Sequence, residues 1–167
     1  MYQFLILSHI IGTVLGVGGA TFAEILSMRA LKDGTINKEE SALLKAVYTT
    51  LRVGLIIAVL SGFGFLLFFR INGQEDRLLD PQLWAKMTIV TVLVFNALLL
   101  TLHRIPFWLG GAISLTSWYA ALVLGSWRGL SSSYVNIILV YILAIFLVAG
   151  ILHVIKKWYF RPPPKNV

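Results

Sequence analysis

The chain has 167 residues, of which 58% are hydrophobic and 13% charged, and it contains no cysteine. Such a composition is too apolar for a soluble domain of this length and predicts a polytopic membrane protein with short loops. The absence of cysteine excludes disulfides, thiolate metal sites and iron–sulfur clusters. The net charge of +7 would also suit nucleic acid. Membrane topology explains the basic residues better, so we expect no nucleic-acid partner.

Five stretches are long and apolar enough to cross a lipid bilayer, and they predict an all-α bundle. They cover about residues 2–28, 47–69, 82–102, 107–127 and 134–155, followed by a basic, proline-rich tail at 156–167. We interpret residues 1–167 as one transmembrane domain. The first span has no basic segment before it and is too long for a signal peptide, so we expect it to be retained.

The connections between the spans carry signals for helix starts and turns. Asn37, with Glu40 three residues later, is typical of a helix start. Asp80-Pro81 predicts the start of the third span, because proline is favoured at the first helical position. Pro106 lies in a very short connection. The third and fourth spans should therefore form a tight antiparallel hairpin.

The basic residues predict the orientation of the five spans. An N-terminus outside and a C-terminus in the cytoplasm place most of the 14 Lys and Arg residues inside. The inside group comprises Arg29, Lys32, Lys38, Lys45, Arg52, Arg104, Lys156, Lys157, Arg161 and Lys165. The outside group comprises Arg70, Arg77, Lys86 and Arg128. The tail at 156–167 is then cytoplasmic.

The first span carries a stripe of small and polar residues along one helical face. The stripe consists of His9, Gly12, Thr13, Gly16, Ala20, Ala23, Glu24 and Ser27. Small residues let membrane helices approach closely, and ionisable groups inside a membrane usually face protein or a cavity. We therefore expect this stripe to face the interior of the bundle, with His9 and Glu24 towards opposite membrane surfaces.

His9 and Lys86 form the first candidate site, because the predicted topology places both in the outer half of the membrane. His9 lies roughly 10 Å deep, at about 1.5 Å per helical residue. One interpretation is a haem or another cofactor bound by His9, with Lys86 as second ligand or charge partner. The alternative is structural: Lys86 extends to the outer headgroups and His9 hydrogen-bonds a neighbouring carbonyl.

A second candidate cluster lies towards the inner surface. Glu24 and Arg52 are interpreted as an intramembrane ion pair, because an unpaired charge in hydrocarbon is costly. His103 and His153 fall near the same surface, where histidine needs no special role. The alternatives are a second metal site formed by His103 and His153, or a proton path through Glu24.

The first three spans resemble those of the copper resistance D-like membrane proteins and the related membrane-embedded protoporphyrinogen IX oxidases of bacteria. The resemblance rests on HIIGTVLGVGG around His9, on LRVGLIIAVLSGFGFLL, and on LWAKMTIVTVLVFNALLLTLHR around Lys86. It implies haem b at His9 and Lys86, and a prokaryotic cytoplasmic (inner) membrane. Two positions depart from the pattern. Those families often have tryptophan at the position of Gly16, and the oxidases have histidine near the position of Asn96. The resemblance therefore implies architecture rather than one reaction.

These observations lead to a hypothesis and two alternatives from other classes. The hypothesis is an integral membrane protein that binds haem b and takes part in electron transfer or porphyrin oxidation, in contact with lipid and with a redox partner or a second copy. The first alternative is a permease-like or proton-handling protein without haem, with a path lined by Glu24, Arg52, Asn96 and His153. The second is a structural subunit of a membrane complex.

Overall fold

The computed structural model describes residues 2–30, 37–127 and 132–159. In this part of the chain all regular secondary structure is helical, and five helices are long and apolar enough to span a membrane. They are α1 (Tyr2–Ala30), α2 (Lys38–Ile71), α4 (Pro81–Thr101), α5 (Phe107–Ser126) and α6 (Tyr134–Tyr159), with the short α3 (Glu75–Leu78) between α2 and α4. The predictions of an all-α fold and of five spans are confirmed.

Two helices extend beyond the predicted spans. α2 begins at Lys38 rather than near residue 47, because the Asn37 side chain accepts a hydrogen bond from the Glu40 amide and the Glu40 carboxylate accepts one from the Asn37 amide. The predicted helix start is thus the start of the second span itself. α6 continues to Tyr159, so the expected basic tail is helical over residues 156–159. The remaining tail lies outside the described residues.

The connection between α4 and α5 is the predicted tight hairpin. α4 starts as expected, with Asp80 capping the Gln82 amide and Pro81 in the first turn. At its other end the His103 amide donates to Leu100 and the Arg104 amide to Leu99, the pattern of a Schellman motif. His103 itself has a φ of 53°. Glycine usually occupies this position, because a side chain is disfavoured there.

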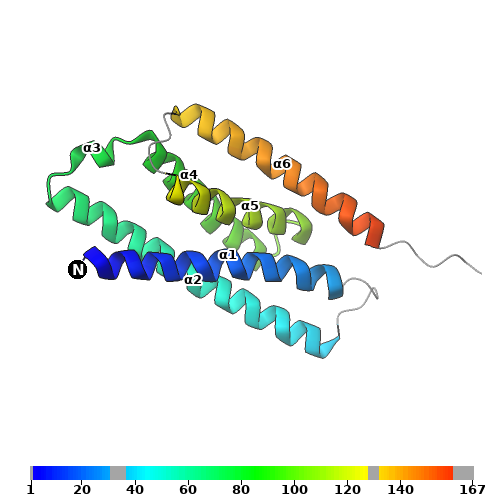
Figure 1. Ribbon diagram of the computed structural model, residues 1–167. Coiled ribbons are helices and arrows are strands. Elements are labelled where there is room, and N and C mark those ends of the chain that lie inside the picture. The colour runs from blue at the N-terminus through cyan, green and yellow to red at the C-terminus, as the bar shows by residue number, and fades with distance from the viewer. Residues whose placement is uncertain (1, 31–36, 128–131, 160–167) are drawn as a thin grey trace, which may run out of the picture.

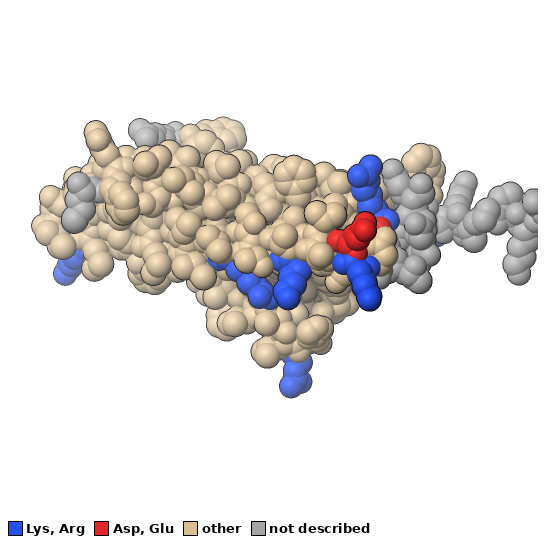
Figure 2. Space-filling model, turned by 90° about the horizontal axis from the view of Figure 1, so that it is seen from below, with Lys and Arg blue, Asp and Glu red and all other residues tan. Residues whose placement is uncertain are grey.

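The helices form two groups joined by α5 (Figure 1). α1 packs along α2 and against α5, while α4, α5 and α6 pack against one another. α1 begins and α6 ends at opposite ends of the bundle, as an odd number of spans requires. On the face shown in Figure 2, Lys and Arg gather towards the end of the molecule where α1 ends and α2 begins, with few at the other end.

The polar stripe of α1 faces the bundle interior, as predicted. Gly12, Gly16, Ala20, Ala23, Glu24 and Ser27 are buried, and His9 and Thr13 are half-buried. The closest contact is between α1 and α2, where a Cβ atom on Gly12 would lie 2.6 Å from the Ala58 backbone nitrogen. One on Gly54 would lie 2.9 Å from the Gly16 nitrogen. The small residues therefore set the distance between these two helices.

Candidate functional site

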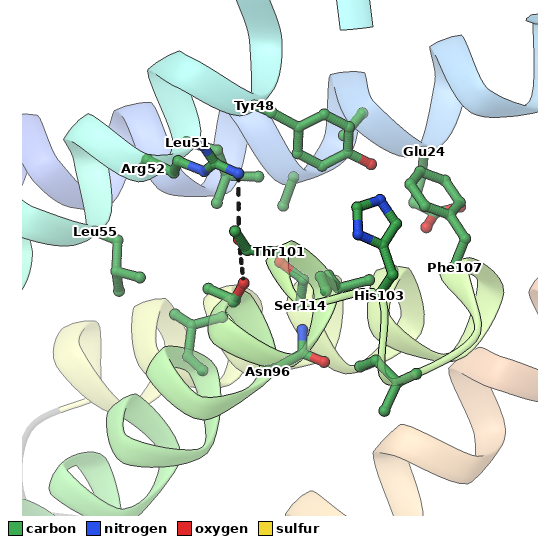
Figure 3. Close-up of a pocket in the computed structure, with 17 residues that line it drawn as sticks. Glu24, Tyr48, Leu51, Arg52, Leu55, Asn96, Thr101, His103, Phe107 and Ser114 are labelled. Atoms are coloured by element: carbon green, nitrogen blue, oxygen red, sulfur yellow. Dashed lines mark hydrogen bonds between the residues drawn. The ribbon is translucent and has the colours of Figure 1, made fainter. Parts of the chain in front are cut away.

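A cavity of about 390 Å³ lies between α1, α2, α4 and α5, next to the α4–α5 turn (Figure 3). Its polar side chains come from all four helices and from the turn. They are Glu24, Tyr48, Arg52, Asn96, Thr101, His103 and Ser114. Leucine and alanine side chains make up most of the remaining wall. This volume falls within the range of about 300–1,000 Å³ that is common for ligand pockets.

The cavity keeps apart the two charges that we expected to pair. Glu24 is 5% exposed, and its Oε2 lies 3.4 Å from the Nζ of Lys156 on α6. Arg52 instead donates from Nη2 to the Thr101 hydroxyl at 3.2 Å, across from α2 to α4. The predicted Glu24–Arg52 ion pair is therefore wrong in its partners. The reason is spatial: α6 brings a lysine to the far side of Glu24, and the cavity separates the two expected partners.

Two buried oxygen atoms at this cavity lack a hydrogen-bond donor. Asn96 is 4% exposed, and its side-chain nitrogen donates to the Gly110 carbonyl at 2.8 Å. This bond fixes the amide and leaves Oδ1 without a partner among the described residues. Glu24 Oε2 also makes no hydrogen bond there, although it lies near Lys156. Asn96 thus links α4 to α5 with its side-chain nitrogen alone.

Because residue 111 is a glycine, the wall of the cavity has room for the Glu24 carboxylate. A Cβ atom on Gly111 would overlap Glu24 Oε1, so any side chain there would displace the carboxylate. Since Gly111 and Glu24 both line the cavity, Oε1 lies against its α5 wall. Oε2 faces Lys156. One oxygen of the carboxylate thus lies against α5 at the cavity, and the other faces Lys156 of α6.

The two inner histidines occupy different surroundings. His103 lines the cavity, and its ring lies between Tyr48 and Phe107 (Figure 3). His153 is exposed on α6 and does not line the cavity. Among the described residues no group of three or more His, Asp or Glu side chains is placed to hold a metal ion. His103 and His153 therefore do not line one cavity.

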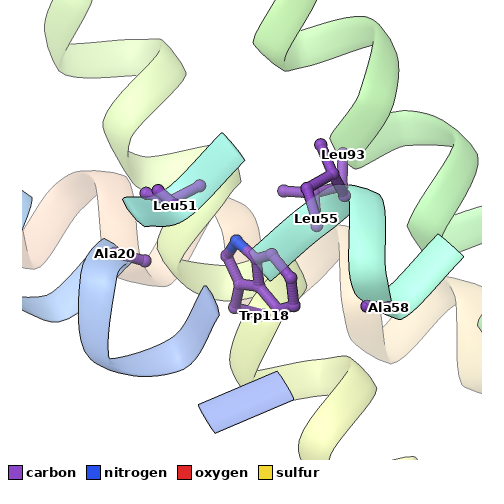
Figure 4. Close-up of a cluster of buried hydrophobic side chains, with 6 residues drawn as sticks. All are labelled: Ala20, Leu51, Leu55, Ala58, Leu93 and Trp118. Atoms are coloured by element: carbon purple, nitrogen blue, oxygen red, sulfur yellow. The ribbon is translucent and has the colours of Figure 1, made fainter. Parts of the chain in front are cut away.

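Towards the middle of the bundle, the cavity ends at a buried hydrophobic cluster (Figure 4). Trp118 of α5 is 2% exposed and packs among residues from α1, α2 and α4. The cluster consists of Ala20, Leu51, Leu55, Ala58, Leu93 and Trp118, four of which also line the cavity. The cavity is thus closed on this side by packed side chains rather than by polar groups.

His9 lies at the other end of α1, half-buried against α2. Its Nδ1 lies 2.9 Å from the Ser61 hydroxyl oxygen. The single hydroxyl proton of Ser61 is already directed to backbone carbonyls of α2, at 2.7 Å from Ile57 and 3.1 Å from Ala58. When Ser61 donates to one of these carbonyls it accepts from His9, and the neutral ring then carries its proton on Nδ1. This geometry leaves the lone pair on Nε2.

Lys86 lies on α4, half-buried and within electrostatic range of His9. Its ammonium group makes no hydrogen bond or ion pair within the described part of the chain. Neither of the two cavities described, the inner one and an apolar groove between α5 and α6, is lined by His9 or Lys86. A neutral imidazole at His9 and a lysine that Asp80 attracts without pairing with it are residue types that could hold a haem.

Sequence reasoning did not identify Lys156 or Tyr48 as parts of a site. Lys156 looked like a surface residue next to Lys157, and only the path of α6 brings it to Glu24. Tyr48 looked like an interfacial aromatic residue.

Comparison of the chain with models of protein families, with curated proteins and with solved structures found no match. The proposals below therefore rest on the residues and geometry of this chain and on the resemblance in its first three spans.

Proposed function

We propose that this membrane protein binds haem b at His9 and serves in one-electron redox chemistry, either electron transfer or porphyrin oxidation. The observation that carries the proposal is the hydrogen bond between His9 Nδ1 and the Ser61 hydroxyl, in which His9 can donate. Histidines that ligate metals typically donate their other ring N–H in this way, which fixes the tautomer and the orientation of the ring. Haem iron needs a neutral imidazole with a free lone pair, and Nε2 of His9 carries one.

Lys86 supports the same proposal as a charge partner. A cation inside a membrane span is costly unless something neutralises it, and Lys86 has no ion pair within the described residues. Asp80 attracts Lys86 without pairing with it, and a haem propionate would add a directly paired anion. The resemblance of the first and third spans to haem-binding families selects the same two residues. Bound haem would supply an iron centre that cycles between two oxidation states; His9 would hold and orient it.

The proposal predicts a coloured protein. The full chain, purified in detergent from cells with adequate haem supply, should show a Soret band and a change in its visible bands on adding dithionite. His9→Ala should abolish both. Ser61→Ala should retain the ligand but weaken haem binding by about 10–100-fold, because the ring then loses its fixed tautomer.

His153→Ala is the matched control, since His153 is an exposed histidine on α6 and should leave the spectrum unchanged. A well-folded wild-type protein that is colourless would refute the proposal. So would a His9→Ala protein with an unaltered haem spectrum. In either case Lys86 and His9 would have only structural roles.

We further propose that the protein lies in a prokaryotic cytoplasmic membrane with its N-terminus outside and its C-terminus in the cytoplasm. The support is the distribution of basic residues over the helix ends. Arg29, Lys38 and Lys157 lie at one end of the bundle, and Arg70 and Arg77 at the other. The richer end should be cytoplasmic by the positive-inside rule.

The lack of native cysteine makes this orientation directly testable. Single cysteines at Asp76 in α3 and at Glu39 at the start of α2 lie at opposite ends of the bundle, and both positions are exposed. In intact cells a membrane-impermeant maleimide should label Asp76→Cys, and Glu39→Cys only after permeabilisation. The reverse pattern would show that the N-terminus is inside.

A further inference from the structure

We infer that the inner cavity binds a small zwitterion, with its ammonium group at Glu24 and Asn96 and its acid group at Arg52. This inference is independent of haem at His9, which lies at the other end of α1. Its starting point is that one cavity is lined by an acidic and a basic side chain that are not paired with each other. A ligand with both charges would complement the two together.

The acceptors for an ammonium group are already in place. Asn96 Oδ1 is a buried oxygen without a donor in the described chain. Glu24 presents Oε1 at the cavity wall, while its Oε2 is ion-paired with Lys156. Both residues are more than nine-tenths buried. A buried acceptor left unpaired is costly, so Asn96 Oδ1 is stabilised by a ligand or water that donates to it. An ammonium group has three donors and no acceptor, which suits Asn96 Oδ1 together with the Glu24 carboxylate.

Arg52 supplies a donor for an acid group in the same cavity. Arg52 is exposed towards the cavity and uses Nη2 for the Thr101 hydroxyl, a neutral partner. A guanidinium has five donors and binds carboxylate or phosphate with two of them at once. Within the described chain, further N–H donors of Arg52 are therefore available for a ligand. The leucine and alanine walls between these groups would accept an aliphatic side chain.

His103 gives a further reason to assign a ligand to this cavity. Its backbone adopts a φ of 53°, and an unstrained residue for that position is glycine. Strained residues held in place by their surroundings are concentrated at functional sites. The histidine ring that this conformation presents lies at the cavity beside Tyr48. It adds a hydrogen-bonding group at the cytoplasmic end.

Two sources could provide such a zwitterion: a free amino acid with an aliphatic side chain, or the headgroup of an ethanolamine phospholipid. The test uses the full chain in phosphatidylcholine nanodiscs, whose headgroup ammonium carries no N–H donor. The thermal unfolding midpoint is followed against the concentration of leucine, of its decarboxylated analogue 3-methylbutylamine and of its deaminated analogue 4-methylpentanoate. Parallel samples receive phosphoethanolamine or nanodiscs containing phosphatidylethanolamine.

We expect at least one zwitterion to raise the unfolding midpoint. If leucine does so, each singly charged analogue should bind at least about tenfold more weakly, the loss of about 1.4 kcal/mol. Stabilisation only by phosphoethanolamine or by phosphatidylethanolamine would assign the same chemistry to a lipid headgroup. Arg52→Met should abolish the preference for leucine over 3-methylbutylamine, while Lys45→Met, an exposed change on the same helix, should preserve it.

Glu24→Gln should remove the complementary preference for leucine over 4-methylpentanoate. If that variant fails to fold, the exposed Arg52→Met change still decides the matter. The inference is overturned if no zwitterion stabilises the wild type. It is equally overturned if leucine and its singly charged analogues bind alike, or if Arg52→Met retains the full preference.

Discussion

Replacing Gly12 with leucine is expected to separate α1 from α2 and to give the largest loss of stability among single changes at the helix contacts. A Cβ atom at this position would lie 2.6 Å from the Ala58 nitrogen and 2.9 Å from the Gly54 oxygen. Both are backbone atoms, so neither can move without shifting a whole helix. Overpacking of this kind costs about 3 kcal/mol or more. The thermal unfolding midpoint of the purified protein should fall accordingly.

Gly18→Leu is the matched control for this prediction. Gly18 lies on the same helix, and a Cβ atom there would meet nothing within 4 Å. Leucine also favours helix over glycine by up to about 1 kcal/mol. Gly18→Leu should therefore leave the unfolding midpoint unchanged or raise it. Equal losses from the two changes would show that α1 and α2 do not pack through Gly12.

The second large effect is expected from Lys156→Met. This change removes the only cation within 4.0 Å of Glu24 among the described residues. Both side chains are largely buried, at 13% exposure for Lys156 and 7% for Glu24. Removing one partner of a buried ion pair costs about 3–5 kcal/mol, because the other charge remains buried. The end of α6 should then detach from α1, which limited proteolysis and the unfolding midpoint can detect.

The neighbouring lysine and a second substitution complete this experiment. Lys157→Met should have little effect, since Lys157 is exposed. Adding Glu24→Gln to Lys156→Met should recover much of the lost stability, because it removes the uncompensated charge. If Lys156→Met and Lys157→Met behave alike, the ion pair does not hold α6 to α1.

Local sequence patterns were enough to predict the helices and the face that α1 buries. The alternation of small, polar residues with Leu, Ile and Val identified the stripe from His9 to Ser27, and the structure buries it. The start of α2 at Asn37 and of α4 at Asp80 followed from hydrogen bonds between residues two or three apart. Such signals need no knowledge of how the helices pack.

The partners of the charged residues could not be predicted in this way. Depth in the membrane grouped Glu24, Arg52, His103 and His153, and the first three of these line one cavity. It could not show that α6 turns Lys156 towards Glu24, or that a cavity separates Glu24 from Arg52. These outcomes depend on the rotation of each helix about its axis. Rotation is set by packing across the whole bundle.

The central claim is that His9, with Nδ1 held by Ser61, binds haem b. The most direct measurement is the haem content of the full chain purified from haem-replete cells, determined as the pyridine haemochrome and compared with that of His9→Ala. We predict haem b in stoichiometric amount in the wild type and none above background in a folded His9→Ala protein. A folded wild-type protein without haem, or equal haem in both proteins, would contradict the claim.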